Sequence, residues 1–187
     1  MKFTLSIAFA LLSVGFASAA AVPTDLESRG GIFPVCSPIR RLLSVPFLRA
    51  YNPQIVDHFY TTSSREMNNA VRNSGYTAER TASFIFSNQQ PQTTPLFRLY
   101  SASATDHFYT TDLGEKNNAI RSSGYADEGT AGFVYTTAIC GSVPLYRLYS
   151  AEGKDHFYTT STSERDSAAG NGYSVEGIAG YVFTSRF

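Results

Sequence analysis

The hexapeptide Asp-His-Phe-Tyr-Thr-Thr occurs three times in this chain of 187 residues, at 57–62, 106–111 and 155–160. Each copy starts 49 positions after the one before it, and the flanking residues repeat as well. A Pro-x-x-Arg-x-Tyr stretch precedes every copy, and a Gly-Tyr pair and an Ala-x-aromatic stretch follow it. A period in this range is typical of folds built from copies of one supersecondary unit. The sequence therefore predicts three repeats, at 46–94, 95–143 and 144–187.

Each repeat is expected to form two strands, a helix and a third strand. The Pro-x-x-Arg-x-Tyr stretch and the hexapeptide are rich in aromatic and branched residues, and about five turn residues between them indicate a hairpin. Ser63, Asp112 and Ser161 each stand three positions before a glutamate, which is the capping box of a helix N-terminus. The glycine of each Gly-Tyr pair then supplies the left-handed residue that ends a helix.

The repeats are expected to pack on one another, because a short helix and a single hairpin are each marginal in water. Three units are too few for a long solenoid and suit a ring. The sequence thus predicts a β-rich α+β fold, a closed pseudo-threefold body of three ββαβ repeats with one short helix each, either trefoil-like or like a three-bladed propeller. Residues 30–45 have no counterpart after the third repeat and are expected to close the ring.

The N-terminal residues are typical of an export signal. After a short positive start, Phe3–Phe16 is almost wholly apolar, and Ala17-Ser18-Ala19 is a small-residue cleavage site. Residues 1–19 are therefore predicted to be a signal peptide, which makes the protein secreted and extracellular. Residues 20–29 are a candidate pro-segment, and 30–187 would be a single domain. No later apolar stretch is long enough for a membrane span, so no membrane insertion is expected.

Charge and cysteine content exclude several classes of function. The 15 basic and 15 acidic residues balance, so the chain lacks the basic surplus that nucleic-acid binding needs. Two cysteines are too few for a four-thiolate zinc site. In an exported chain, Cys36 and Cys140 are expected to form a disulfide, and the alternative is a pair of buried free thiols.

The candidate ligand-binding residues are an arginine, a tyrosine, an aspartate and a histidine at matching positions of every repeat. Carboxylate and guanidinium groups hydrogen-bond sugar hydroxyls, and a tyrosine ring stacks on a pyranose face. In the expected hairpin register Arg147 and Asp155 would be diagonal neighbours and form an ion pair, and the alternative is that this pair only holds the hairpins in register. The full set is Arg49, Tyr51, Asp57, His58, Arg98, Tyr100, Asp106, His107, Arg147, Tyr149, Asp155 and His156.

The three histidines allow three interpretations. Equivalent imidazoles on a shared axis would suit a zinc or copper ion, and imidazoles facing a ligand would suit a binding site. The expected register places Leu148 opposite His156, which favours a core position with the ring bonded to a tyrosine hydroxyl or to the backbone. We therefore expect no metal and no cofactor.

The sequence contains no recognisable catalytic motif. Gly-x-Ser-x-Gly, His-Glu-x-x-His and phosphate-loop patterns are absent from it. Glu79, Glu128 and Glu176 recur, and paired carboxylates are typical of glycosidases, but nothing in the sequence places two at working distance. A structural role for these glutamates, as a cap or a salt bridge, is favoured, and no catalytic residue is predicted.

The repeat resembles that of an uncharacterised secreted family of fungi and bacteria, domain of unknown function 5648. The third copy follows the pattern Pro-Leu-Tyr-Arg-Leu-Tyr, Asp-His-Phe-Tyr-Thr-Thr, Gly-Tyr and Glu-Gly-Ile-Ala-Gly-Tyr-Val almost letter for letter, and the resemblance spans 46–183. The first copy departs most, with Ala50, Arg80 and Ser83 where the others have Leu or Gly. In bacteria such repeats are often attached to secreted hydrolases, which implies a targeting or binding role.

Repetition of the candidate set favours binding over catalysis. An active site needs one asymmetric constellation, whereas weak sites repeated three times add through effective concentration. We expect a secreted, non-catalytic, lectin-like protein that binds carbohydrate or cell-wall polysaccharide. One rival is a protein-binding or effector-like module that uses exposed Tyr and Phe. The other is a glycan-directed hydrolase with an Asp/Glu/His site in one repeat.

Overall fold

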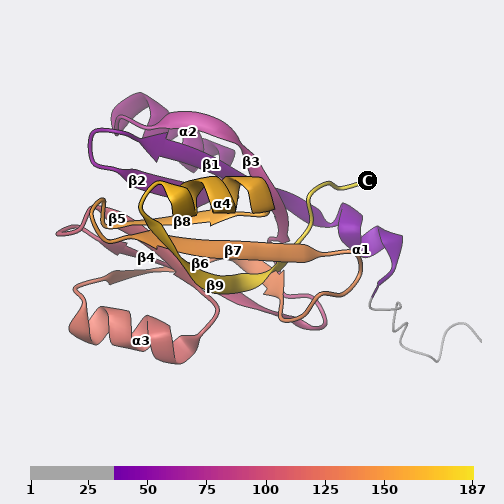
Figure 1. The fold of residues 1–187 in the computed structure, drawn as a ribbon. Coiled ribbons are helices and arrows are strands. Elements are labelled where there is room, and N and C mark those ends of the chain that lie inside the picture. Colours follow the sequence, from indigo (N-terminus) through magenta and orange to yellow (C-terminus); the bar gives the residue numbers. More distant parts are fainter. Residues whose placement is uncertain (1–35) are drawn as a thin grey trace, which may run out of the picture. The chain divides into compact units, whose positions relative to one another are not determined.

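The computed structural model describes residues 36–187 (Figure 1). The predicted signal peptide at 1–19, the candidate pro-segment at 20–29 and residues 30–35 of the expected closing segment lie outside the described residues. The described part begins with a short helix, α1 (Pro38–Leu42), and continues as three groups of elements.

Each group contains two strands, a helix and a third strand, in the order that the sequence predicts. The first group comprises β1 (Ser44–Asn52), β2 (Asp57–Thr61), α2 (Ser64–Asn73) and β3 (Thr77–Phe86). The second comprises β4 (Thr93–Ser101), β5 (Asp106–Thr110), α3 (Leu113–Ser122) and β6 (Ala126–Tyr135). The third comprises β7 (Val143–Ser150), β8 (Asp155–Thr159), α4 (Thr162–Gly170) and β9 (Tyr173–Val182).

Nine antiparallel strands and four short helices make up residues 36–187, which confirms the predicted β-rich character. Within each group the first strand lies between the other two, so that β1 pairs with both β2 and β3. The expected closure is not found in the hydrogen-bonded sheet of this part of the chain, because β2, β5 and β8 each pair with one strand and leave their other edge open. Neighbouring groups share only single residue pairs, which are too few to close a sheet: Phe86 with Phe133, Tyr135 with Tyr181, and Phe84 with Phe183.

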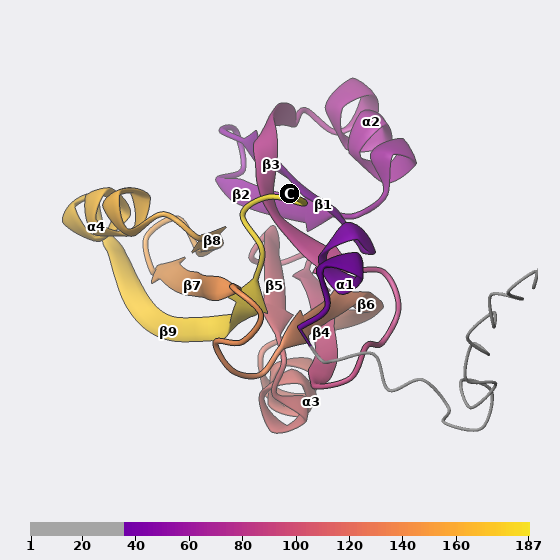
Figure 2. The same cartoon turned by 90° about the vertical axis from the view of Figure 1, so that its right-hand side faces the viewer.

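The three longer helices begin at the predicted caps. Ser63 Oγ accepts a hydrogen bond from the backbone N–H of Glu66 at 3.2 Å, and Asp112 and Ser161 cap α3 and α4 in the same way. Gly75 follows α2 with a φ of +75°, the left-handed conformation that the sequence predicts there. Figure 2 shows α2, α3 and α4 on the outer sides of three different strand groups. None of the helices in the described residues combines the length and the apolar character that a membrane span requires.

Tyrosine hydroxyls join the open strand edges where backbone pairing is missing. Tyr60, Tyr109 and Tyr158 occupy the fourth position of the three hexapeptides and are fully buried. The Tyr109 hydroxyl accepts from the N–H of Tyr60 at 2.8 Å and donates to its carbonyl oxygen at 2.6 Å. Tyr158 bonds Tyr109 in this way, and Tyr60 bonds Tyr158. Each hydroxyl therefore satisfies both outward backbone groups of one edge-strand residue.

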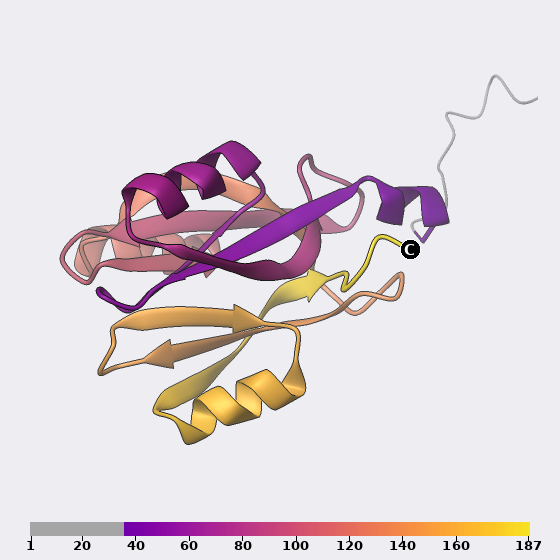
Figure 3. The same ribbon diagram turned by 90° about the horizontal axis from the view of Figure 1, so that it is seen from above.

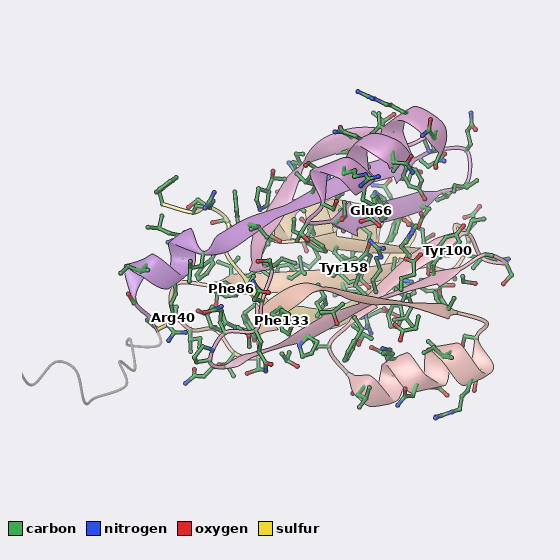
Figure 4. All side chains as sticks on the ribbon, turned by 180° about the vertical axis from the view of Figure 1, so that it is seen from behind. Arg40, Glu66, Phe86, Tyr100, Phe133 and Tyr158 are labelled. Atoms are coloured by element: carbon green, nitrogen blue, oxygen red, sulfur yellow. A yellow bond between two sulfur atoms is a disulfide. The ribbon has the colours of Figure 1, made fainter. Side chains whose placement is uncertain are left out.

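Apolar side chains from all three groups pack around these tyrosines. The three rings contact one another edge to face, with centroids 5.4 to 5.5 Å apart, an arrangement that aromatic rings prefer. Figure 4 labels Tyr158 in the interior. The surrounding buried residues include Phe47, Ile85, Leu96, Val134 and Leu145.

The described part of the expected closing segment lies against the C-terminal residues. Arg41 donates through Nε to the carbonyl oxygen of Ser185 at 2.9 Å, and a second arginine bond runs back from the C-terminal segment to α1. Figure 3 shows α1 and the C-terminus on the same side of the fold. The predicted disulfide between Cys36 and Cys140 is present and ties the residue two positions before α1 to the loop before β7.

Replacing one of these hydroxyls tests their role in holding the groups together. Tyr109→Phe leaves the N–H and the carbonyl oxygen of Tyr60 buried without partners, and each such group costs about 1–3 kcal/mol. We expect the free energy of unfolding, measured by urea titration, to fall by roughly 2–4 kcal/mol. Tyr146→Phe is the control, because this tyrosine is partly exposed and water can replace a lost partner. Equal stability of the two variants would contradict the role.

Candidate functional site

Three pockets with the same residue types open between neighbouring groups. We name them after the helix that lines each one. Their volumes are about 360 Å³ for the α2 pocket, 350 Å³ for the α3 pocket and 470 Å³ for the α4 pocket. The α2 pocket takes Phe59, Glu66 and Tyr76 from the first group and Tyr100, His107 and Glu128 from the second. The α3 pocket takes Phe108, Glu115 and Tyr125 from the second group and Tyr149, His156 and Glu176 from the third. The α4 pocket takes Phe157, Glu164 and Tyr173 from the third group and Arg49, His58 and Glu79 from the first.

Each histidine is held by the aspartate of another hexapeptide. Asp57 is fully buried, and its Oδ1 accepts the backbone N–H of His107 at 2.8 Å. Its Oδ2 lies 2.6 Å from His107 Nδ1 and also accepts the hydroxyl of Tyr76. A carboxylate accepts hydrogen bonds, so Nδ1 carries the proton and Nε2 is left for the pocket. Asp106 holds His156, and Asp155 holds His58, with the same contacts.

Each imidazole lines a different pocket. His107 Nε2 lies 3.8 Å from Glu128 Oε2 in the α2 pocket, and His156 Nε2 lies 3.7 Å from Glu176 Oε2 in the α3 pocket. The histidines thus line three different pockets, and within residues 36–187 they do not come together as one group of possible metal ligands. The Tyr100 ring packs on His107 with centroids 4.6 Å apart. The histidine is thus fixed on one face by an aromatic ring and at Nδ1 by a buried carboxylate.

The three buried aspartates come close to one another. One carboxylate oxygen of each of Asp57, Asp106 and Asp155 lies within 4.8 Å of the others. Each carboxylate already accepts bonds from a backbone N–H, an imidazole and a tyrosine hydroxyl. Burial first, and then the Asp57 carboxylate, raise the pKa of Tyr76, so this hydroxyl keeps its proton and donates. These contacts explain the cluster, because the three carboxylates hold the three histidines in position.

The arginines of the candidate set each join two glutamates. Arg98 donates through both Nη atoms to Glu66, at 3.0 and 2.8 Å, and its Nε lies 2.9 Å from Glu128. Its guanidinium also lies over the Phe59 ring, 5.4 Å from the centroid. Arg147 and Arg49 repeat this arrangement, Arg147 with Glu115 and Glu176, and Arg49 with Glu164 and Glu79. Burial acts to lower the pKa of Arg98, but the glutamates outweigh it and raise the pKa.

The predicted Arg–Asp ion pair is wrong. The turn between β7 and β8 has four residues, because Ser150 already pairs with Asp155, whereas a turn of about five was expected. As a result Tyr149, and not Leu148, lies opposite His156, and Arg147 lies opposite Tyr158. A shift of one residue exchanges the neighbours of every side chain in a hairpin.

The candidate residues therefore fall into two sets. The histidines, with Arg49, Tyr100 and Tyr149, line the pockets. Arg98 and Arg147 bond the pocket glutamates, and Tyr51 packs on His58 with centroids 4.4 Å apart. The aspartates lie behind the histidines, with no exposed surface. The sequence-based interpretation of the glutamates as salt-bridge partners agrees with the contacts of Glu79, Glu128 and Glu176.

Sequence reasoning missed the glutamates of the three capping boxes as pocket residues. In a capping box, the glutamate bonds back to the N–H of the cap residue. Here the N–H of Ser63 donates instead to Thr61 Oγ1 at 3.0 Å, which leaves Glu66 available for Arg98. The N–H groups of the other two cap residues also donate to a threonine hydroxyl, which leaves Glu115 and Glu164 available for arginine in the same way. The available signal was the spacing of 32 positions between glutamate and arginine, which Glu66 and Arg98 share with Glu115 and Arg147.

Acid is expected to weaken these contacts. Burial raises the pKa of Glu66, but the hydrogen bonds from Arg98 and Thr61 lower it by more and hold the pKa below its usual value, as they do at Glu115 and Glu164. A lowered folded-state pKa stabilises the fold above the ordinary glutamate pKa of about 4.3, and the contribution is lost as the pH falls through the folded pKa. We expect the free energy of unfolding by urea to fall between pH 5 and pH 3, and to fall less in Glu66→Gln. An identical pH dependence in both proteins would contradict this.

The sequence matches the model of one known protein family. The family described as Domain of unknown function (DUF5648) matches residues 46–183. Neither the curated proteins nor the solved structures contain a match to this sequence. The matched range includes every pocket residue described above, from Arg49 to Glu176. Because the match covers most of its length, the chain belongs to the DUF5648 family.

Proposed function

We propose that the protein is a secreted, non-catalytic, lectin-like protein that binds carbohydrate or cell-wall polysaccharide in the three pockets between its groups. The observation that carries this proposal is the recurrence, in pockets of 350 to 470 Å³, of carboxylates, an imidazole nitrogen and aromatic rings. Pockets of this size hold small ligands, and a few converging polar groups orient them. Carboxylates and imidazoles hydrogen-bond sugar hydroxyls, and the rings offer apolar faces to a pyranose.

The arrangement of the side chains supports a pseudo-threefold ring of three repeats. Tyr109 bonds Tyr60, Tyr158 bonds Tyr109, and Tyr60 bonds Tyr158, so these bonds run from each copy to another and return to the first. The sheet itself is open, and side chains would complete the ring. We infer a propeller-like body, since each group carries a helix that a plain trefoil lacks.

Several weak sites on one chain suit a repeating polymer. When one pocket holds a polysaccharide, the neighbouring pockets meet further sugar units at a high effective concentration. Secretion, inferred from the N-terminal residues and consistent with the disulfide between Cys36 and Cys140, would bring the protein to such polymers outside the cell.

Binding to a panel of glycans tests the proposal. We expect the secreted chain to bind at least one wall polysaccharide saturably, on a glycan array and by isothermal titration calorimetry. Tyr100→Ala removes a ring from the α2 pocket and should weaken binding there roughly tenfold, which corresponds to about 1.4 kcal/mol. Tyr146→Ala, outside the three pockets, is the control. Absence of saturable binding to every polysaccharide tested would refute the proposal.

The second candidate function is a glycan-directed hydrolase. A buried carboxylate at Nδ1 of His107 and a free Nε2 beside Glu128 are the arrangement of a general base with its orienting group. Incubation with wall polysaccharides separates the two functions, because a hydrolase releases new reducing ends and a binding protein does not. If the α2 pocket is the active one, His107→Gln abolishes the release, while His156→Gln leaves it unchanged.

A further inference from the structure

One of the three pockets contains a second arginine on its capping-box glutamate. Arg80, on β3, donates through Nη2 to Glu164 Oε1 at 2.6 Å in the α4 pocket. Arg80 follows Glu79 directly, and the residues that follow Glu128 and Glu176 are glycines. The α2 and α3 pockets therefore have the same glutamate and no arginine beside it in sequence.

The capping-box glutamates of these two pockets have room for a further partner. Glu66 is bonded by Arg98 and Thr61, and Glu115 by Arg147 and Thr110, with no second cation on either among the described residues. The exposed fraction of the side chain is 38% for both of them, against 26% for Glu164 under Arg80. The guanidinium of Arg80 thus covers a carboxylate that stays accessible in the other two pockets.

The net charge of the pockets differs as well, and the α4 pocket is less negative than the other two. At the α2 pocket, the carboxylates of Glu66, Glu128 and Asp57 outnumber the cationic groups of Arg98 and His107, whether or not the imidazole is protonated. The α3 pocket has the same excess of negative charge. At the α4 pocket Arg80 adds one positive charge and reduces this excess. A cationic group on a ligand would reduce it in the same way in the other two.

We propose that the α2 and α3 pockets bind the protonated amino group of a hexosamine, as in a deacetylated amino-sugar polymer, and that Arg80 blocks the α4 pocket to it. This inference rests on the proposed carbohydrate-binding function and names its substrate class. The ammonium group takes the place that the Arg80 guanidinium has on Glu164, and the rings of Phe59 and Tyr100 in the α2 pocket, or of Phe108 and Tyr149 in the α3 pocket, pack on the sugar. Aromatic faces add to the attraction of a cation.

Titration with defined oligosaccharides tests the ligand class. The probes are tetrasaccharides of glucosamine, of N-acetylglucosamine and of glucose, titrated calorimetrically into the secreted chain at near-neutral pH. We expect the glucosamine oligomer to bind at least roughly tenfold tighter than the other two, at two sites per chain, and to weaken as salt screens the charges. A lysine-rich peptide of equal charge serves as the competing cation.

Three variants test which pockets are used. Arg80→Ala uncovers Glu164 and should raise the number of glucosamine sites from two to three. Glu66→Gln removes the charge of the α2 pocket and should lower the number to one. Glu152→Gln removes an exposed acidic residue from the turn between β7 and β8 and should leave two sites. Urea unfolding of each variant verifies that it is folded before titration.

The outcomes separate this inference from the proposed function. Equal affinity for the neutral and the amino oligosaccharides would overturn the inference and leave carbohydrate binding in place. Binding of no saccharide at all would overturn both. Three sites in the unmodified protein, or an unchanged number in Arg80→Ala, would overturn the blocking role of Arg80. Tighter binding of the peptide than of the glucosamine oligomer would indicate a protein partner for the pockets and would contradict the proposed amino-sugar ligand.

Discussion

The structure depends on hydrogen bonds to the outward backbone groups of three strands that have no neighbouring strand on one side. Backbone groups buried without partners cost roughly 1–3 kcal/mol each, and β2, β5 and β8 have a neighbouring strand on one side only. The hexapeptide supplies the missing partners from side chains. Asp57 accepts the N–H of His107, and Tyr109 in return bonds both backbone groups of Tyr60. The first copy thus bonds the second through an aspartate, and the second bonds the first through a tyrosine. The same two kinds of hydrogen bond join the other pairs of copies.

The pockets follow from the same hydrogen bonds. The aspartate that accepts the backbone N–H also holds the imidazole, so the residue that joins two groups also orients the side chain that faces the pocket. The arginine beside it bonds one glutamate from each of two groups. Stability and the pocket surface therefore share residues, and changes at the aspartates are expected to disturb both.

Much of the local structure could be predicted from the sequence, because local rules determine it. Capping boxes and glycines located the helices, and the predicted signal peptide together with the two cysteines indicated the disulfide. The hairpin register was missed by one residue, since a turn of four residues and one of five fit the same aromatic pattern. The role of Glu66 was hidden because its usual partner, the cap N–H, bonds Thr61 instead. The contact of Asp57 with His107 joins residues 50 positions apart, and no local pattern encodes it.

Every pocket takes its walls from two copies of the repeated sequence, and the α4 pocket joins the last copy to the first. A chain with a single copy holds only halves of such pockets, and it completes one only by associating with other chains like itself. Having three copies in one chain removes the concentration dependence of that association. It also allows the copies to differ from one another: in a symmetric homotrimer an arginine at position 80 would bond the glutamate of all three pockets, whereas in this chain Arg80 bonds the glutamate of one.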